Sequence, residues 1–282
     1  MKYKVSFYVA AYNAERTISR CLNSIINQSI KPLEIIVIND GSIDDTSKIL
    51  LNFKKNIKII NNSKNLGLAQ SRNIAIKNST GDYVAALDAD VLCSKNWLKF
   101  LLKDLVFKNI DLAGGKLIEL NSKDSVNKWR ELNMRQNWGD KDISNPNFVF
   151  GCNTLLKRNI WENFFKYDQN YKTNGEDVNF SRRLRDKNFN TFYNSKAICY
   201  HMQFDNIDSL SERYWRYNYY GAGIKKKSFF KSFKVCIREF KKTISRILKH
   251  FCLGQYKLVK IDFLVCIKYF FLEFKNYKYE KN

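Results

Sequence analysis

The chain has 282 residues, of which 45% are hydrophobic, and its 49 Lys and Arg against 27 Asp and Glu give a formal net charge of +22. A chain of this length and apolar content can bury a sizeable core, which excludes disorder throughout and suits one large α/β domain with an appendage. The charge predicts an anionic partner such as nucleic acid, lipid headgroups or a phosphorylated substrate.

The N-terminal part of the chain alternates short β-branched runs with helical patterns. Strands are predicted at residues 5–9, 34–38, 57–60 and 83–87. Helices are predicted between them, the first from Ile18 with Asn13 as its N-cap, the second through 49–53 and the third from Gly67 to about 77. Such alternation predicts a mostly parallel twisted sheet flanked by helices, whose ligands bind beyond the carboxyl ends of the strands.

The following part of the chain, up to His201, has a less regular pattern. The predicted elements are a helix from residue 94, strands at 111–120 and 148–156, a helix at 176–186 and short strands at 189–193 and 196–200. We expect Gly114 and Gly115 to interrupt the first of these strands. Residues 121–147 are polar and are expected to be irregular or helical, in a position where an acceptor could be selected.

Beyond about residue 210 the pattern changes to basic helices. Residues 212–282 hold 18 basic and 5 acidic side chains, whereas residues 1–211 hold 31 and 22. We therefore predict a first domain at 1–210, with halves at 1–92 and 93–210, and a basic helical extension at 211–282.

The extension is also rich in aromatic residues, a composition common in helices that lie against anionic membranes. Its most apolar segment, 260–274, is interrupted by Asp262, Lys268 and Glu273, and no uninterrupted apolar stretch reaches the roughly 18 residues of a spanning helix. Two interpretations stay open: an interfacial helix on a membrane, or a helix packed on the first domain with a solvated basic face.

The cysteines and the N-terminus bear on the compartment. The seven cysteines form no CxxC pair and no zinc-like spacing, which predicts free thiols in a reducing compartment. The first residues lack a small-residue cleavage pattern, so we expect no signal peptide. The predicted location is cytoplasmic, peripheral on the cytoplasmic face of the membrane.

Two carboxylates, Asp88 and Asp90, follow the fourth predicted strand with Ala89 between them. This spacing suits a hard divalent cation whose shell is completed by phosphate oxygens and water. Asp40 lies at another strand end. Because a single Asp-x-Asp triplet also occurs as a solvated turn, the surrounding motifs decide between the two interpretations.

Five motifs occur in order along the chain. They are VSFYVAAYN at 5–13, LEIIVINDGSIDDT at 33–46, NLGLAQSRN at 65–73, GDYVAALDAD at 81–90 and GEDVNFSRRL at 175–184. Their order and spacing resemble those of the glycosyltransferases of family 2. The resemblance covers residues 4–201 and implies a GT-A (Rossmann-like) fold and metal-dependent, inverting transfer from a nucleoside-diphosphate sugar, with a UDP-sugar favoured.

The resemblance assigns the nucleotide to the loops after the first strands. Tyr12 and Asp40 match positions that hold the base and ribose, and Arg72 matches one near the diphosphate. The full predicted nucleotide set is Ala11, Tyr12, Asn13, Asp40, Asn65, Arg72, Asp88 and Ala89. The alternatives are structural: a helix-capping carboxylate for Asp40 and a surface cation for Arg72.

The resemblance also implies a metal site and a base. Asp90 matches the direct metal ligand, Asp88 a residue shared between ribose and metal, and His201 an imidazole near the metal or diphosphate. A bound Mn²⁺ or Mg²⁺ would offset the charge that develops on the departing diphosphate. Glu176 and Asp177 match the acidic pair that holds the general base, and we favour Asp177 for this role.

The acceptor side is less well marked. Trp129, Trp138 and Asn153 are the predicted acceptor contacts, although large aromatic residues also occur in cores. The family's usual pattern is altered at Ala11, where Pro is common, and in the segment around Tyr167, which precedes the acidic pair.

The implied activity is that of a hexosyl- or N-acetylhexosaminyltransferase that extends a glycan or lipid-linked saccharide in surface polysaccharide or glycoprotein glycan assembly. Three alternatives stay open: direct transfer to a polyprenyl phosphate, a non-catalytic protein that binds anionic surfaces or RNA, and a sugar nucleotidyltransferase. The acids at strand ends argue against the second, and we expect no nucleic-acid partner. The third requires a glycine-rich basic loop at 10–13, where this chain has AAYN.

Overall fold

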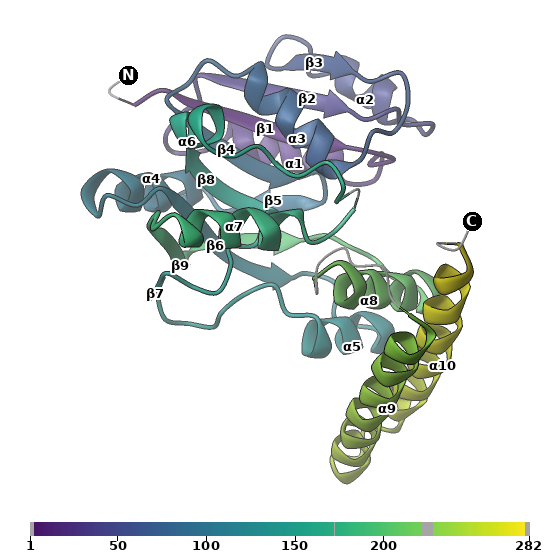
Figure 1. Ribbon diagram of the computed structural model, residues 1–282. Coiled ribbons are helices and arrows are strands. Elements are labelled where there is room, and N and C mark those ends of the chain that lie inside the picture. Colours follow the sequence, from purple (N-terminus) through teal and green to yellow (C-terminus); the bar gives the residue numbers. More distant parts are fainter. Residues whose placement is uncertain (1–2, 172, 222–227, 280–282) are drawn as a thin grey trace. The chain divides into compact units, whose positions relative to one another are not determined.

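The computed structural model describes residues 3–171, 173–221 and 228–279 (Figure 1). The chain divides into two compact units. Unit 1 comprises Met1–Leu120 and Gln136–Met202, and unit 2 comprises Asn121–Arg135 and Gln203–Asn282. The division differs from the predicted boundary after residue 210, because the chain changes unit at 203 and the segment 121–135 belongs with the C-terminal helices.

Unit 1 is built on a nine-stranded sheet of order β3-β2-β1-β4-β8-β6-β9-β5, with β7 paired to β9. The strands are β1 (Val5–Ala11), β2 (Glu34–Asn39), β3 (Lys58–Asn61), β4 (Tyr83–Asp88), β5 (Val91–Cys93), β6 (Leu112–Glu119), β7 (Ile143–Ser144), β8 (Asn153–Lys157) and β9 (Thr191–His201). The first four strands are parallel, β8 is antiparallel to β4 and β6, and β6 is parallel to β9. The predicted α/β class, with a mostly parallel sheet flanked by helices, is confirmed.

Side chains of the central strands alternate between two cores. In β1, Phe7 and Val9 enter one core and Tyr8 enters the other, as the two-residue period of a strand requires. The first core contains buried residues of α1 (Ile18–Ile26), α2 (Thr46–Leu51) and α4 (Trp97–Phe107). The second contains those of α3 (Leu68–Lys77), α6 (Arg158–Asn163) and α7 (Glu176–Asp186). Helices therefore cover both faces of the sheet (Figure 1).

The order of strands places a switch point beside β1. The chain runs from β1 to β2 and β3 on one side and then returns to place β4 on the other side. In open α/β sheets, ligands bind where the order reverses, at the carboxyl ends of the strands. The loop after Ala11 and the end of β4 at Asp88 both lie at this edge.

Several local predictions differ from the structure. Asn13 is not an N-cap: it adopts a left-handed conformation with φ of 49°, and Thr17 precedes α1 instead. Residues 148–152 are not part of a strand, since β8 begins at Asn153. The two short strands predicted around 189–200 are one strand, β9. The interruption predicted at Gly114 and Gly115 is a shift in the register of β6 against β9 after Gly115, where a Cβ would overlap the carbonyl oxygen of Ala197, and the strand itself continues.

Unit 2 is helical and has its own core. Its helices are α5 (Ser125–Asn133), α8 (Ile207–Gly221), α9 (Phe229–Cys252) and α10 (Tyr256–Tyr279). Trp129 of α5, Tyr214 and Trp215 of α8, and Val265 and Tyr269 of α10 are buried together. Asp124 caps α5 by accepting from the backbone amides of Val126 and Asn127. No helix among the described residues is both long and apolar enough to cross a membrane.

Candidate active site

The centre of the polar cluster in unit 1 is the guanidinium of Arg72, on the buried side of α3. Its side chain is 2% exposed. Nη2 donates to Oδ1 of Asp88 at 3.0 Å, and Nη1 lies 3.0 Å from Oε1 of Glu176. The guanidinium also lies over the ring of Tyr167. A buried cation requires such partners, so Arg72 is not the surface cation of the structural alternative.

Glu176 and Asp177 begin α7 after Gly175, which has a φ of 87°. Glu176 is buried, and its Oε2 has no hydrogen-bond partner among the described residues. Burial raises the pKa of Glu176 to about 8, although Arg72 acts in the opposite direction. Buried and paired with Arg72, this carboxyl group is closed to an acceptor hydroxyl.

Asp177 has a different environment from its neighbour. It is half-buried, and its two oxygens accept from the backbone amides of Gly151 at 2.9 Å and Val178 at 2.8 Å. The Gly151 backbone lies so close that a Cβ there would overlap the Arg72 guanidinium and the Cβ of Asp177. The carboxylate of Asp177 is thus oriented by backbone donors while part of it faces solvent.

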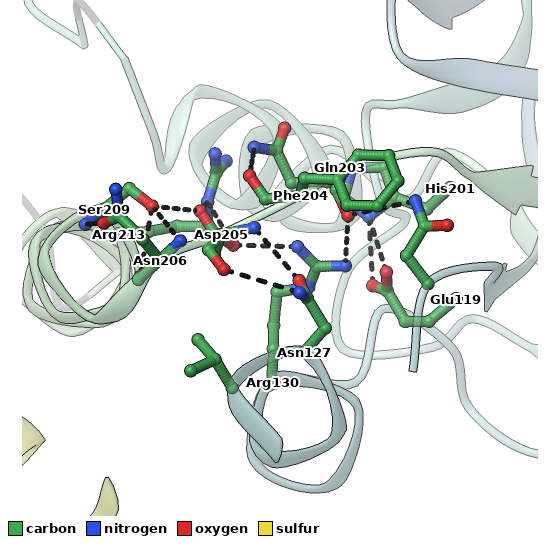
Figure 2. A network of polar contacts seen from close by, with 12 residues as sticks. Glu119, Asn127, Arg130, His201, Gln203, Phe204, Asp205, Asn206, Ser209 and Arg213 are labelled. Atoms are coloured by element: carbon green, nitrogen blue, oxygen red, sulfur yellow. Dashed lines mark hydrogen bonds and ion pairs between the residues drawn. The ribbon is translucent and has the colours of Figure 1, made fainter. Parts of the chain in front are cut away.

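A second cluster joins Asp90, His201 and Glu119. His201 ends β9 and pairs with Val91 of β5, which places its ring beside the loop that holds Asp90. Its Nε2 lies 3.2 Å from Oδ2 of Asp90. Its Nδ1 lies 3.0 Å from Oε1 of Glu119 (Figure 2). Burial alone would lower the pKa of His201, but the carboxylates of Asp90 and Glu119 raise it to about 9.

In this second cluster, Asp90 and His201 are the two side chains that would contact a divalent metal. Asp90 Oδ2 and His201 Nε2 lie next to each other, and Glu119 holds the other ring nitrogen, as the carboxylate partner of a metal-bound histidine does. Among the described residues, no three His, Cys, Asp or Glu side chains form a group that could hold a metal ion. Any ion here would therefore need phosphate oxygens and water as its remaining ligands, an arrangement that Mg²⁺ commonly adopts.

Of the predicted nucleotide residues, Tyr12, Asn13, Asp40 and Asn65 lie in the loops after β1, β2 and β3. Tyr12 is 48% exposed, and Asn65 is exposed. Asn13 links two of these loops, since its Oδ1 accepts from the amide of Ile43. Ala11 and Ala89 are buried. Because an alanine side chain has no polar atom, these two residues could hydrogen-bond a nucleotide only through their backbone.

Asp40 binds the loop that leads into α3 and, among the described residues, accepts from none of the helix's own first amides. Its Oδ1 accepts from the side chain of Asn62 and the amide of Leu66, and its Oδ2 accepts from the amide of Gly67, which precedes α3. Gly41, with a φ of 69°, allows the backbone to pass close to Lys64. Asp40 thus fixes the loop that leads to Arg72, and its contact with a nucleotide stays a prediction.

Two of the three predicted acceptor contacts are buried. Trp129 is fully buried in unit 2, where its Nε1 donates to Asp262, so its ring has no face for a sugar. Asn153 is buried too, and its Oδ1 accepts from the Gly115 amide. Trp138 is partly exposed in unit 1 and packs edge-on against Phe148. The structure argues against Trp129 and Asn153 and leaves Trp138 available.

Two residues of the site were missed in the sequence. Glu119 is a carboxylate at the end of a predicted strand, the same signal that singled out Asp40 and Asp88. Gly151 lies in a segment predicted as strand, where a glycine indicates close approach of another group. The sequence did not show which residues Glu119 and Gly151 contact, because these contacts join parts of the chain that are far apart in the sequence.

The chain is similar in sequence to a known protein family and to individual proteins. Residues 6–204 match the model of the family described as glycosyl transferase family 2. The poly-beta-1,6-N-acetyl-D-glucosamine synthase of Staphylococcus epidermidis is 27% identical over 82% of this chain, which spans 57% of that protein.

A second relative and a solved structure show further similarity. The UDP-Glc:alpha-D-GlcNAc-diphosphoundecaprenol beta-1,3-glucosyltransferase WfgD of Escherichia coli is 33% identical over 45% of this chain and 51% of its own length. The crystal structure of residues 1–349 of S. aureus TarS with UDP-GlcNAc covers 74% of this chain and 64% of its own, with 20% identity and a TM-score of 0.58. The chain thus spans about half to two thirds of these proteins.

Proposed function

The chain belongs to glycosyl transferase family 2, and from this membership we propose that it transfers a sugar from a nucleoside-diphosphate sugar to a saccharide or lipid-linked saccharide. The donor is a UDP-sugar, and the anomeric configuration is inverted. The observation that carries the proposal is the meeting of Arg72, Asp88 and the α7 acids at the carboxyl ends of the sheet. TarS, which shares the fold, was crystallised with UDP-GlcNAc.

The proposed base is Asp177. In a single displacement, the acceptor oxygen bonds to the anomeric carbon while the bond from that carbon to the diphosphate oxygen breaks, and the acceptor's hydroxyl proton passes to the carboxylate. Asp177 is oriented by the amides of Gly151 and Val178 and is partly exposed. Glu176 is buried against Arg72 and instead positions that guanidinium.

The proposed metal is Mn²⁺ or Mg²⁺, held by Asp90 and His201, with Asp88 close by. When bound, such an ion would stabilise the negative charge that builds up on the departing diphosphate. Glu119 fixes the orientation of the His201 ring through Nδ1. Arg72 adds a fixed positive charge on the other side of Asp88. These residues supply electrostatic stabilisation of the leaving group.

The acceptor is proposed to be a growing glycan, carried on a lipid. WfgD acts on a diphosphoundecaprenol-linked sugar according to its name, and the synthase of S. epidermidis makes a polysaccharide. A lipid carrier would require the protein to work at a membrane surface, for which unit 2 offers independent support.

The metal site is tested with Asp90→Ala. We expect the wild-type protein to bind UDP-sugars more tightly when Mn²⁺ is added, and the variant to lose this gain, because one of two protein ligands is gone. Isothermal titration with UDP-GlcNAc, UDP-glucose and a GDP-sugar, with and without Mn²⁺, measures the effect. Asp82→Ala, a change in the loop before β4, is the control. Equal Mn²⁺ enhancement in Asp90→Ala would contradict the assignment.

A further inference from the structure

Helix α9 exposes its apolar side chains. Large apolar residues recur along it at intervals of three and four, and all of them are exposed: Phe230, Phe233, Ile237, Phe240, Ile244, Leu248 and Phe251. Such spacing places them on one side of a helix. We call this set the apolar stripe. In an ordinary surface helix this side would be buried.

The buried side of α9, in contrast, is mostly polar. The buried residues there are Ser232, Cys236, Glu239, Thr243 and His250, which follow intervals of three, four and seven. Helix α10, which packs alongside, buries Asp262 and Glu273 together with apolar residues such as Val265, whereas Phe263 and Phe271 are exposed. The usual packing is thus inverted in α9, and the two helices form a hairpin that buries its acids and exposes large apolar side chains.

The buried acids are held by specific donors. Asp262 accepts from Trp129 at 2.7 Å and from Arg246 Nε at 3.1 Å, and lies 2.6 Å from His250. Glu239 accepts from Tyr214 and from Arg246 Nη2 at 2.8 Å. Asp262 and Glu239 thus each have several donors, and Glu273 accepts from Trp215, so burial leaves these carboxylates with hydrogen-bond partners. The acids that interrupt the apolar pattern of 260–274 therefore do not face solvent.

This packing leaves only positive charges exposed on α9. Every acidic residue of α9 and α10 within the described residues, namely Glu239, Asp262 and Glu273, is buried. The exposed charged side chains of α9 are all basic: Lys231, Lys234, Arg238, Lys241, Lys242 and Lys249. Several follow a residue of the apolar stripe directly, and one residue turns a helix by about 100°, so a basic stripe runs beside the apolar one.

We propose that α9 lies in the plane of an anionic lipid bilayer. The apolar stripe enters the boundary between headgroups and acyl chains, and the basic stripe contacts the lipid phosphates. In this position the apolar side chains leave water and the basic side chains lie beside negatively charged phosphates. A second copy of this chain would bring basic stripes together, and a nucleic acid would leave the apolar stripe in water. The proposal does not depend on the donor or reaction proposed above.

Flotation of the full-length protein with vesicles tests the proposal. Vesicles of neutral phosphatidylcholine are compared with vesicles that also contain phosphatidylglycerol. We expect binding to the anionic vesicles that weakens as salt is raised. In the triple variant Phe233→Ser, Phe240→Ser and Ile244→Ser, the partition coefficient should fall at least about tenfold, since three apolar side chains no longer leave water.

The matched control replaces three exposed apolar residues of unit 1, Leu51→Ser, Phe107→Ser and Phe164→Ser, and should float as the wild type does. Sedimentation velocity without lipid and a binding assay with single-stranded RNA complete the test. The proposal is overturned if the α9 triple variant binds anionic vesicles like the wild type. It is also overturned if the stripe changes only self-association or only RNA binding. Circular dichroism and UDP-sugar binding report whether each variant folds.

Discussion

At the scale of single residues, two adjacent acids differ in their burial and in their hydrogen-bond and ion-pair partners. Glu176 is buried beside Arg72, whereas Asp177 is half-buried and held by backbone amides. The sequence motif indicated that one of the two acts as a base and favoured Asp177, but it gave no physical reason for the choice because both belong to the same helix turn. Burial, which depends on packing against α3, makes the distinction.

The raised pKa of Glu176 predicts a pH dependence of stability. In the unfolded chain this group loses its proton near 4.5, and in the folded protein near 8. The folded state therefore binds more protons between these values, and this contribution to stability, fully present below pH 4.5, is lost as the pH rises to about 8. Glu176→Gln removes it, so the stability of the variant relative to the wild type should rise across this range.

Urea denaturation between pH 5 and 8 measures this difference. Asp177→Asn serves as the comparison, because the two changes are chemically alike and adjacent. A constant difference between wild type and Glu176→Gln across this range would show that Glu176 ionises normally in the folded protein.

At the scale of elements, most strands and helices of the parallel half could be read from hydrophobic periodicity. The sequence located β1 to β4 and the helix α7, whose predicted bounds 176–186 match the structure. It did not predict that β9 is one long strand or that residues 148–152 form a loop against Arg72. Those features are set by pairing with β6 and by the close approach of Gly151, which periodicity does not encode.

The loop at Gly151 should control the geometry of the site. Gly151→Ala would push against Arg72 and Asp177, so we expect the turnover number to fall at least about tenfold, because small displacements of a base are costly. Gly114→Ala is the control, because the nearest atoms to its Cβ belong to Val149 and Asn153 and not to Arg72 or Asp177. Steady-state kinetics and thermal denaturation of both variants separate activity from stability. Equal losses of activity would refute a specific role for Gly151.

The inverted hairpin depends on its buried acids. Asp262→Ala leaves Trp129 Nε1 and Arg246 Nε without their acceptor, and breaking a buried ion pair in this way costs about 3–5 kcal/mol. We expect faster amide hydrogen exchange in α9 and α10. Asp208→Ala changes an exposed acid that pairs with Lys268 and should have little effect. Unchanged exchange in Asp262→Ala would mean that the network does not hold the hairpin.

At the scale of the whole molecule, the family and the fold were predictable because five motifs fall in order along unit 1. The organisation of unit 2 was not. The polar segment 121–147 suggested an acceptor region, yet its helix α5 packs with α8 and α10 through Trp129. Within unit 2, Arg130 of that helix donates to Asp205, which also accepts from Ser209 and Arg213 (Figure 2). Contacts so far apart in sequence leave no periodic signal.

The central claim is that this chain transfers a sugar with Asp177 as the base. The direct measurement is the rate of UDP release from a UDP-sugar in the presence of Mn²⁺ and an acceptor, for the wild type, Asp177→Asn and Glu176→Gln. We predict metal-dependent release that falls at least about a hundredfold in Asp177→Asn. Glu176→Gln should keep most of its activity. Wild-type rates in Asp177→Asn, with the loss in Glu176→Gln instead, would contradict the account.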